Sequence, residues 1–137
     1  MKIKIYVIYG GPGAEHEVSV ASAENVFSAL NPNLYDVQKI YVQKNMHSIF
    51  DGGEDHLDAI IGKLPKDCIV IPVFHGSFGE GGELQKLLER YSILYIGSKS
   101  AAASLAMSKK ETQDVLIAHA ISVPRTILIL SETQKID

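Results

Sequence analysis

Short runs of β-branched and aromatic residues alternate along this chain with stretches whose apolar residues recur every three or four positions. Residues 3–9 form the first such run and predict a strand that ends in a glycine-rich turn. From about Ser19 the apolar positions share one face of a helix, which Asn31-Pro32-Asn33 stops. The same patterns predict further strands at 35–43, 68–74 and 93–96, a last strand after Pro124, and helices at 54–62, 84–91, 100–107 and 109–120.

Strands that alternate with helices indicate βαβ units and a parallel sheet. Residues 68–74 are apolar almost throughout, as expected for a strand buried on both faces. Pro72 within this run has no N–H to donate and indicates a strand end or a bulge. Gly52-Gly53 lies in a hairpin-like connection and is interpreted as a turn. We therefore expect an α/β fold with an open, mostly parallel sheet and helices on both faces, in the Rossmann-like manner.

Composition narrows the classes of partner. The 137 residues fit one domain, and a formal net charge of -3 argues against nucleic acid or an anionic membrane as a partner. The apolar runs are strand-sized and do not predict a membrane span. Residues 1–4 lead into a strand without a signal-peptide pattern, and the single cysteine, Cys68, cannot form an internal disulfide. The expected location is the cytoplasm.

Candidate chemistry lies in two glycine-rich stretches, residues 10–13 and 76–82. Both follow predicted strands, and ligands of open parallel sheets bind beyond the carboxyl ends of the strands. The first stretch is not a dinucleotide fingerprint, because His16 stands where the last glycine is required. Two acidic residues nearby would also repel a pyrophosphate. A nicotinamide-dinucleotide site is therefore disfavoured.

Glu15 follows the first glycine stretch and has two interpretations. Its carboxylate could hold a cationic group such as a substrate ammonium. Alternatively, Glu15 and Glu17 could simply favour the N-terminus of the following helix through its dipole, an effect of a few tenths of a kcal/mol. Spacing alone leaves both interpretations open.

His75 opens the second stretch, and its role is also open at this level. It could donate a hydrogen bond to a substrate carboxylate, or be a satisfied structural residue. A metal site with Glu80 and Glu83 is a third possibility, but no second His/Cys pair completes a metal signature. Elsewhere, Met107 and His119 fall on apolar helix faces and are expected in the core. Tyr6 and Tyr9 alternate with Ile and Val in the first run and are interpreted as sheet packing.

Four ordered stretches of the chain stand out together: Gly10-Gly11 with Ala14-Glu15-His16-Glu17-Val18-Ser19, then His75-Gly76 with Gly79-Glu80, Gly82 and Gln85, then Tyr95-Ile96-Gly97-Ser98, and finally Ser104-Leu105-Ala106-Met107 with Lys109. In this order and spacing they resemble the motifs of D-alanine–D-alanine ligases. The departures are Pro12-Gly13 in place of a small or basic pair, Gly81 where the family usually has Asp, and Ser108 where Asp usually precedes the lysine.

This resemblance implies ATP-grasp chemistry. Such ligases use ATP and Mg²⁺ (or Mn²⁺) to phosphorylate the carboxylate of one D-alanine, and the amine of a second D-alanine then attacks the acyl phosphate. The product is the dipeptide of the peptidoglycan precursor. By resemblance, Glu15 holds the ammonium of the first D-alanine, with Val18 and Ser19 lining its pocket. His75 lies near the carboxyl group with Glu80 as its partner, and Lys109 reaches the ATP phosphates.

The resemblance also sets expectations for the organisation of the chain. Residues 1–123 correspond to a substrate-binding (pre-ATP-grasp) domain, and residues 124–137 to the start of the central ATP-binding lobe. Because the family places its metal ligands and further catalytic groups beyond this region, we expect no metal site here and no activity from these 137 residues alone. A homodimer is expected, and the second substrate could be D-alanine, D-lactate or D-serine. The alternative is a stand-alone binding domain that reuses the fold without catalysis.

Overall fold

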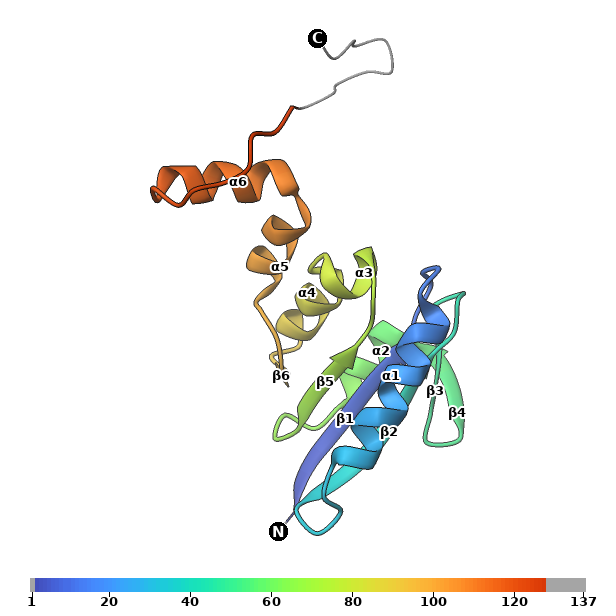
Figure 1. Ribbon diagram of the computed structural model, residues 1–137. Coiled ribbons are helices and arrows are strands. Elements are labelled where there is room, and N and C mark those ends of the chain that lie inside the picture. Colours follow the sequence, from blue (N-terminus) through green and yellow to red (C-terminus); the bar gives the residue numbers. More distant parts are fainter. Residues whose placement is uncertain (1, 128–137) are drawn as a thin grey trace.

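The computed structural model describes residues 2–127, which form one six-stranded sheet in the order β4-β3-β2-β1-β5-β6 with helices around it (Figure 1). The strands are β1 (Ile3–Gly10), β2 (Tyr35–Val42), β3 (His47–Phe50), β4 (Gly53–His56), β5 (Ile69–Val73) and β6 (Leu94–Tyr95). The helices are α1 (His16–Ala29), α2 (Leu57–Lys63), α3 (Ser77–Glu80), α4 (Glu83–Arg90), α5 (Ser100–Met107) and α6 (Lys109–Ala118).

The sheet is mostly parallel, as predicted. Strand β1 lies at its centre and pairs in parallel with β2 and β5, and β5 pairs in parallel with β6. The hairpin β3–β4 adds an antiparallel edge next to β2. The carboxyl ends of β1 and β5 therefore lie side by side, with Tyr9 opposite Val73.

Helices cover both faces of the central strand. Helix α1 packs on one face of β1, while α2 lies behind the sheet (Figure 1). Consecutive residues Ile5, Tyr6, Val7 and Ile8 of β1 are all buried, which only a strand covered on both faces allows. The main core cluster joins β1, β2 and β5 to α2 and α4 and includes Tyr6, Ile8, Ile40, Val70, Leu57, Ile61, Leu84 and Leu88.

The helix predicted at 54–62 is partly wrong, because its first residues belong to β4. Phe50 pairs with Gly53, so that only Asp51 and Gly52 connect the two strands. Both connecting residues have positive φ, 50° and 74°, as a two-residue turn of type I′ requires. The dipeptide Asp51-Gly52 is itself a strong hairpin signal, and it could have predicted this edge of the sheet.

Pro72 lies inside β5 without a bulge. Its neighbour strand β6 reaches only as far as the bond from the Ile96 N–H to the Val70 carbonyl oxygen. Alternate residues of a strand direct their backbone groups to the same side, so Pro72 and Val70 both face the β6 edge. Because β6 has already ended at this level, no strand lies beside Pro72 to accept a hydrogen bond. The missing N–H of proline therefore leaves no ladder hydrogen bond unmade.

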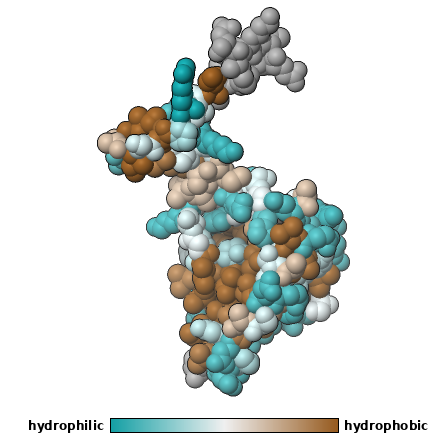
Figure 2. Space-filling model, in the orientation of Figure 1, coloured by the Kyte–Doolittle hydropathy of each residue, from teal (hydrophilic) through white to brown (hydrophobic). Residues whose placement is uncertain are grey.

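Two further sequence predictions differ from the structure. Helix α1 begins at His16 and not at Ser19. Met107 and His119, expected in the core, are exposed. The reason lies in their positions: Met107 is the last residue of α5, and His119 follows α6, which packs mainly against α5 and has no buried residue. Figure 2 shows the resulting apolar surface on this helix, to which Val115 and Ile117 contribute.

The end of the described range has no regular structure between residues 121 and 127. Residues 125–127, where the strand expected after Pro124 would begin, are therefore not in a strand. The rest of that expected strand, and most of the predicted second domain at 124–137, lie outside the described residues. Within residues 2–127 no helix combines the length and apolarity that crossing a membrane would need.

Candidate functional site

Two loops meet at the carboxyl edge of the sheet. The first runs from the end of β1 to the start of α1, and the second from the end of β5 through α3 to α4. Because β1 and β5 are neighbours, the loops lie side by side. A Cβ placed on Gly13 of the first loop would lie 3.9 Å from the backbone oxygen of His75 in the second. The two glycine-rich stretches that the sequence singled out thus form one surface.

The Glu15 carboxylate reaches across to the second loop. It lies so near Gly76 that a Cβ there would be 2.9 Å from Glu15 Oε2. Gly76 also has a φ of 79°, which L side chains rarely adopt. The Glu15 side chain makes no capping hydrogen bond at the start of α1, and the residue is exposed. Its negative charge is therefore presented at the junction of the two loops.

His75 stands beside this junction with two polar neighbours. Its Nε2 lies 3.1 Å from the Ser22 hydroxyl oxygen, and its Nδ1 lies 3.9 Å from Glu80 Oε1. About a third of the side chain, 34%, is exposed. Ser22 was not a candidate from the sequence, because it comes from α1 and only the packing of α1 on β5 brings it to His75. The imidazole is thus held from two elements while it remains open to solvent.

Ser19 does not line a pocket in this structure. It is fully buried, accepts a hydrogen bond of 2.7 Å from the Gly10 N–H, and donates one to the Val73 carbonyl oxygen. Its hydroxyl therefore joins α1 to the ends of both central strands, and the predicted contact of Ser19 with a substrate does not fit this arrangement. Val18, one position earlier, is 52% exposed.

His16 is the residue at this edge whose role the sequence missed. It is the first residue of α1 and is 4% exposed. Its Nδ1 is 2.7 Å from the Gly11 carbonyl oxygen, and its Nε2 is 2.9 Å from the Tyr41 hydroxyl of β2. The sequence used His16 only to reject a dinucleotide fingerprint. The signal available in the sequence was a histidine placed directly after a glycine-rich stretch, which could have indicated a side chain that holds the loop.

Lys109 is not brought together with Glu15 and His75. It is the exposed first residue of α6, next to Ser108, whose hydroxyl accepts a hydrogen bond from the Glu111 N–H. Lys110, by contrast, forms an ion pair with Asp114. A lysine at the positive end of a helix adds its charge to that of the helix dipole, and both suit an anion such as a phosphate.

Glu89 of α4 fixes the helix that leads to Lys109. Its carboxylate accepts hydrogen bonds from the Ser100 N–H (2.9 Å), the Ser100 hydroxyl (2.6 Å) and the Tyr95 hydroxyl (2.7 Å). These bonds, those from Ser100 foremost, lower the pKa of Glu89 from 4.5 to about 2. Desolvation by burial and the bond to Glu89 raise the pKa of Tyr95 to about 12. Since Ser100 begins α5, Glu89 caps that helix from a neighbouring element.

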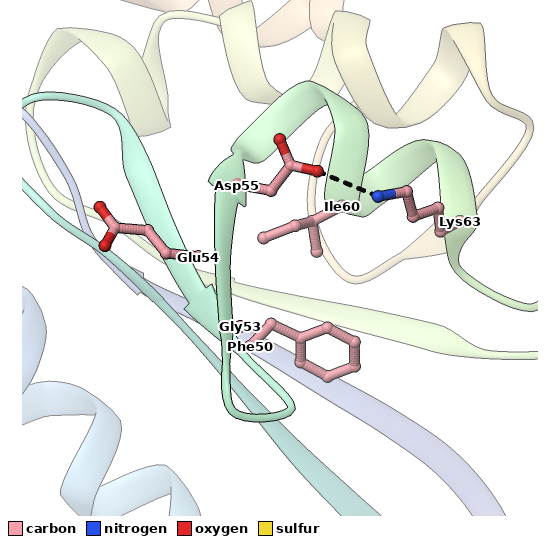
Figure 3. Close-up of a pocket in the computed structure, with 6 residues that line it drawn as sticks. All are labelled: Phe50, Gly53, Glu54, Asp55, Ile60 and Lys63. Carbon is pink, nitrogen blue, oxygen red and sulfur yellow. Dashed lines mark hydrogen bonds and ion pairs between the residues drawn. The ribbon is translucent and has the colours of Figure 1, made fainter.

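The pocket in Figure 3 lies away from this junction, between the β3–β4 hairpin and α2. Phe50 and Ile60 form its apolar wall, and an ion pair of 3.0 Å between Asp55 and Lys63 closes one side. None of the predicted site residues lines it. Among residues 2–127, no three His, Cys, Asp or Glu side chains converge to hold a metal ion.

The loops, their glycines and the sheet order can be compared with known proteins. A family profile described as "D-ala D-ala ligase N-terminus" matches residues 4–62. A D-alanine–D-alanine ligase from Streptococcus pneumoniae is 35% identical in an alignment of length 134 that covers 85% of this chain and 39% of that ligase. The chain is homologous to the N-terminal region of D-alanine–D-alanine ligases. The family resemblance inferred from the four motifs is thereby confirmed.

Solved ligase structures share the fold. A D-Ala:D-Ser ligase from Enterococcus faecalis superposes with a TM-score of 0.78 at 28% identity, over 91% of this chain and 44% of that one. A D-alanine–D-alanine ligase from Bacillus anthracis complexed with ATP gives 0.75 at 25% identity, over 91% of this chain and 37% of that one. The chain spans about two fifths of the length of the curated ligases it matches.

Proposed function

We propose that this chain is the substrate-holding N-terminal part of an ATP-dependent ligase that joins two D-alanines. The observation that carries the proposal is the junction of the two loops, where the Glu15 carboxylate lies over Gly76 beside His75. An amino acid offers an ammonium and a carboxylate a short distance apart. The junction presents a carboxylate and an imidazole, which are their chemical complements.

Each residue has a defined role in this proposal. Glu15 binds the ammonium of the first D-alanine, because its carboxylate is exposed and unused by the helix cap. His75, held by Ser22 and near Glu80, donates to the carboxyl group of the same substrate. Two contacts at opposite ends of a small molecule fix its orientation, and orientation lowers the barrier to the following step. Val18 borders the same surface.

ATP and Mg²⁺ complete the proposed reaction. The related Bacillus anthracis ligase was solved in complex with ATP. The part of ATP that this chain contacts is proposed to be the phosphates, through Lys109 and the start of α6. When bound, ATP with Mg²⁺ supplies the phosphoryl group that activates the substrate carboxylate. The contribution of Lys109 is a positive charge beside the phosphates.

The wider setting follows from the same resemblance. Residues 1–123 form the substrate-binding domain, and 124–137 begin the ATP-binding lobe. The protein is proposed to work in the cytoplasm as a homodimer and to supply a dipeptide for peptidoglycan. The alternative, a binding domain without catalysis, predicts that the loop junction has no preference for D-alanine.

Glu15 provides the direct test. A D-alanine titration of the chain, followed by the backbone amide resonances of Glu15 and Gly76, should show saturable binding that L-alanine does not reproduce. Glu15→Gln removes the charge that meets the ammonium, and we expect at least about tenfold weaker D-alanine binding, since a charge-assisted hydrogen bond contributes about 1.5–3 kcal/mol.

Glu17→Gln is the matched control. Glu17 lies in the first turn of the same helix, so this change removes the same charge near the same helix dipole. We expect D-alanine binding within about twofold of the unsubstituted chain, a change near the few tenths of a kcal/mol that a helix-dipole charge contributes. Equal losses in the two variants would show that Glu15 acts only on the helix, and would contradict the proposed contact.

A further inference from the structure

His16 is a buried ionisable side chain that the proposed substrate contacts leave unused. It directly follows Glu15 and is 4% exposed. Polar groups this deeply buried are costly unless they are hydrogen-bonded, and both ring nitrogens of His16 have partners. The partners come from the first loop and from β2, so the ring joins two separate parts of the site edge.

The chemistry of the partners determines which nitrogen carries the proton. The Gly11 carbonyl oxygen can only accept, so Nδ1, at 2.7 Å, must be the donor. In the neutral ring Nε2 is then the acceptor, and the Tyr41 hydroxyl at 2.9 Å donates to it. The Tyr41 ring stands edge-on to the imidazole, with centroids 5.6 Å apart and planes at 77°. Of the two neutral tautomers of His16, only the Nδ1–H form fits both partners.

The bond to Gly11 holds a backbone that would otherwise have several conformations. Gly10 and Gly11 have φ values of 95° and 96°, in a region that only glycine visits freely. The Gly11 N–H donates to the Val42 carbonyl oxygen at 2.8 Å, and its carbonyl oxygen accepts from His16. Both polar groups of Gly11 are thus tied, one to β2 and one to the start of α1.

Glu15 is placed by this arrangement. It is the N-terminal neighbour of His16, and its own side chain makes no bond that anchors the start of the helix. The imidazole donates to the Gly11 carbonyl oxygen and so ties the first residue of α1 to the loop, while the Glu15 carboxylate stays free of the helix and lies over Gly76.

We propose that His16 is a positioning residue. As the Nδ1–H tautomer it bridges the Gly11 carbonyl and Tyr41, and so holds the Glu15 carboxylate at the junction of the loops where a substrate ammonium binds. The identity of that ammonium as D-alanine rests on the proposed function above. His16 itself does not touch the substrate.

The tautomer can be observed without any ligand. Two-bond ¹H–¹⁵N correlations of the five histidine rings in the chain should include a ring that is protonated at Nδ1 and not at Nε2 and whose signal disappears in His16→Gln. His119, whose Nδ1 lies 2.9 Å from the Val115 carbonyl oxygen, should keep its own Nδ1–H signal in that variant. A His16 ring that is protonated at Nε2, or that exchanges between tautomers, would overturn the proposal.

The positioning effect is tested with a pair of substitutions. His16→Asn keeps an amide N–H near the place of Nδ1 and can still donate to Gly11, while His16→Gln extends its amide toward Tyr41 instead. Both lose the ring and its packing. We expect D-alanine binding within about threefold of the unsubstituted chain for the Asn variant, and about tenfold weaker for the Gln variant.

Each outcome has a distinct meaning. Thermal unfolding midpoints of the two variants show whether they fold equally well. If the unsubstituted chain binds D-alanine and the two variants bind it equally, the positioning role is wrong and the proposed function stands. If the unsubstituted chain shows the Nδ1–H tautomer but no D-alanine binding, the proposed function fails, and with it the claim that His16 orients Glu15 for that substrate.

Discussion

At the residue scale, the glycines of the first loop differ in what they contribute. A Cβ on Gly10 would overlap the Val42 carbonyl oxygen and would press on the His16 ring. Gly13 has ordinary backbone geometry, and a Cβ there would meet no atom nearer than 3.9 Å. The two positions are only three residues apart. Alanine at Gly10 would strain the folded loop, whereas alanine at Gly13 would only reduce the conformational freedom of the unfolded chain.

We predict opposite effects of alanine at these positions. Gly10→Ala should lower the free energy of unfolding by about 1–3 kcal/mol, because it combines a positive φ with a clash against backbone. Gly13→Ala should be neutral or stabilising by about 0.4–1 kcal/mol, because it only restricts the unfolded chain. Urea denaturation of both variants is the measurement. A Gly10 variant as stable as the Gly13 variant would contradict the described loop conformation.

Individual polar residues were only partly readable from the sequence. Glu15 and His75 could be singled out because they follow glycine-rich stretches at strand ends. The sequence could not show that Ser19 turns inward to Gly10 and Val73. Nor could it show that Ser22 meets His75, because these two residues are 53 positions apart. Such pairings depend on how α1 lies across the two strands.

At the element scale, Glu89 decides how α5 is attached to α4. The lowered pKa of Glu89, about 2, gives this attachment a defined dependence on pH. A carboxyl group whose pKa is lower in the folded state than in the unfolded state stabilises the fold. For Glu89 this stabilisation is fully present at pH values above its ordinary pKa of 4.5. That contribution is lost as the pH falls from 4.5 toward 2, because protonation then removes the acceptor for Ser100 and Tyr95.

We predict that Glu89→Gln lowers the thermal midpoint near neutral pH. The difference from the unsubstituted protein should shrink as the pH falls from 4.5 to about 2, because the native carboxyl group becomes neutral too. Thermal unfolding followed by circular dichroism across this range tests it. Glu24→Gln, whose carboxylate makes only a 3.9 Å ion pair with Lys39, is the control and should follow the unsubstituted protein. A constant difference for Glu89→Gln would exclude the capping role.

The elements themselves were well predicted where they carry a strong period. The strand at residues 35–43 and the helix at 100–107 lie within one residue of the observed bounds. The hairpin-like turn expected at Gly52-Gly53 is present, with Asp51-Gly52 as its two connecting residues. Its strands β3 and β4 were missed because they are short and mostly polar. Boundaries near glycine were least certain, since α1 begins three residues before the predicted position.

At the scale of the whole molecule, the sheet has a well-buried core, whereas helix α6 near the end of the described range is largely exposed. Helix α6 has no buried residue, and Val115, Ile117 and Ile121 are between 42% and 58% exposed. The chain also spans only about two fifths of the matched ligases. Binding of a substrate by this chain and catalysis of the reaction are therefore expected to be separate properties, which separate experiments can test.

We predict that the 137-residue chain releases no ADP from ATP in the presence of Mg²⁺ and D-alanine. The chain spans about two fifths of the length of the matched ligases, and the residues that it is proposed to contribute bind D-alanine and approach the phosphates. A coupled assay for ADP, run beside the D-alanine titration, is the measurement. D-alanine-dependent ADP release would show that the chain is catalytically sufficient and would contradict this expectation.

The sequence by itself determined the alternation of strands and helices, the mostly parallel sheet, and the two glycine loops at one edge. These follow from local periodicity and from the rule that parallel strands end on the same side. Only the tertiary structure decided which side chains face a ligand. It buried Ser19 and His16 and exposed Met107 and His119. Burial and hydrogen bonding depend on what packs across from a residue, and no local pattern contains that information.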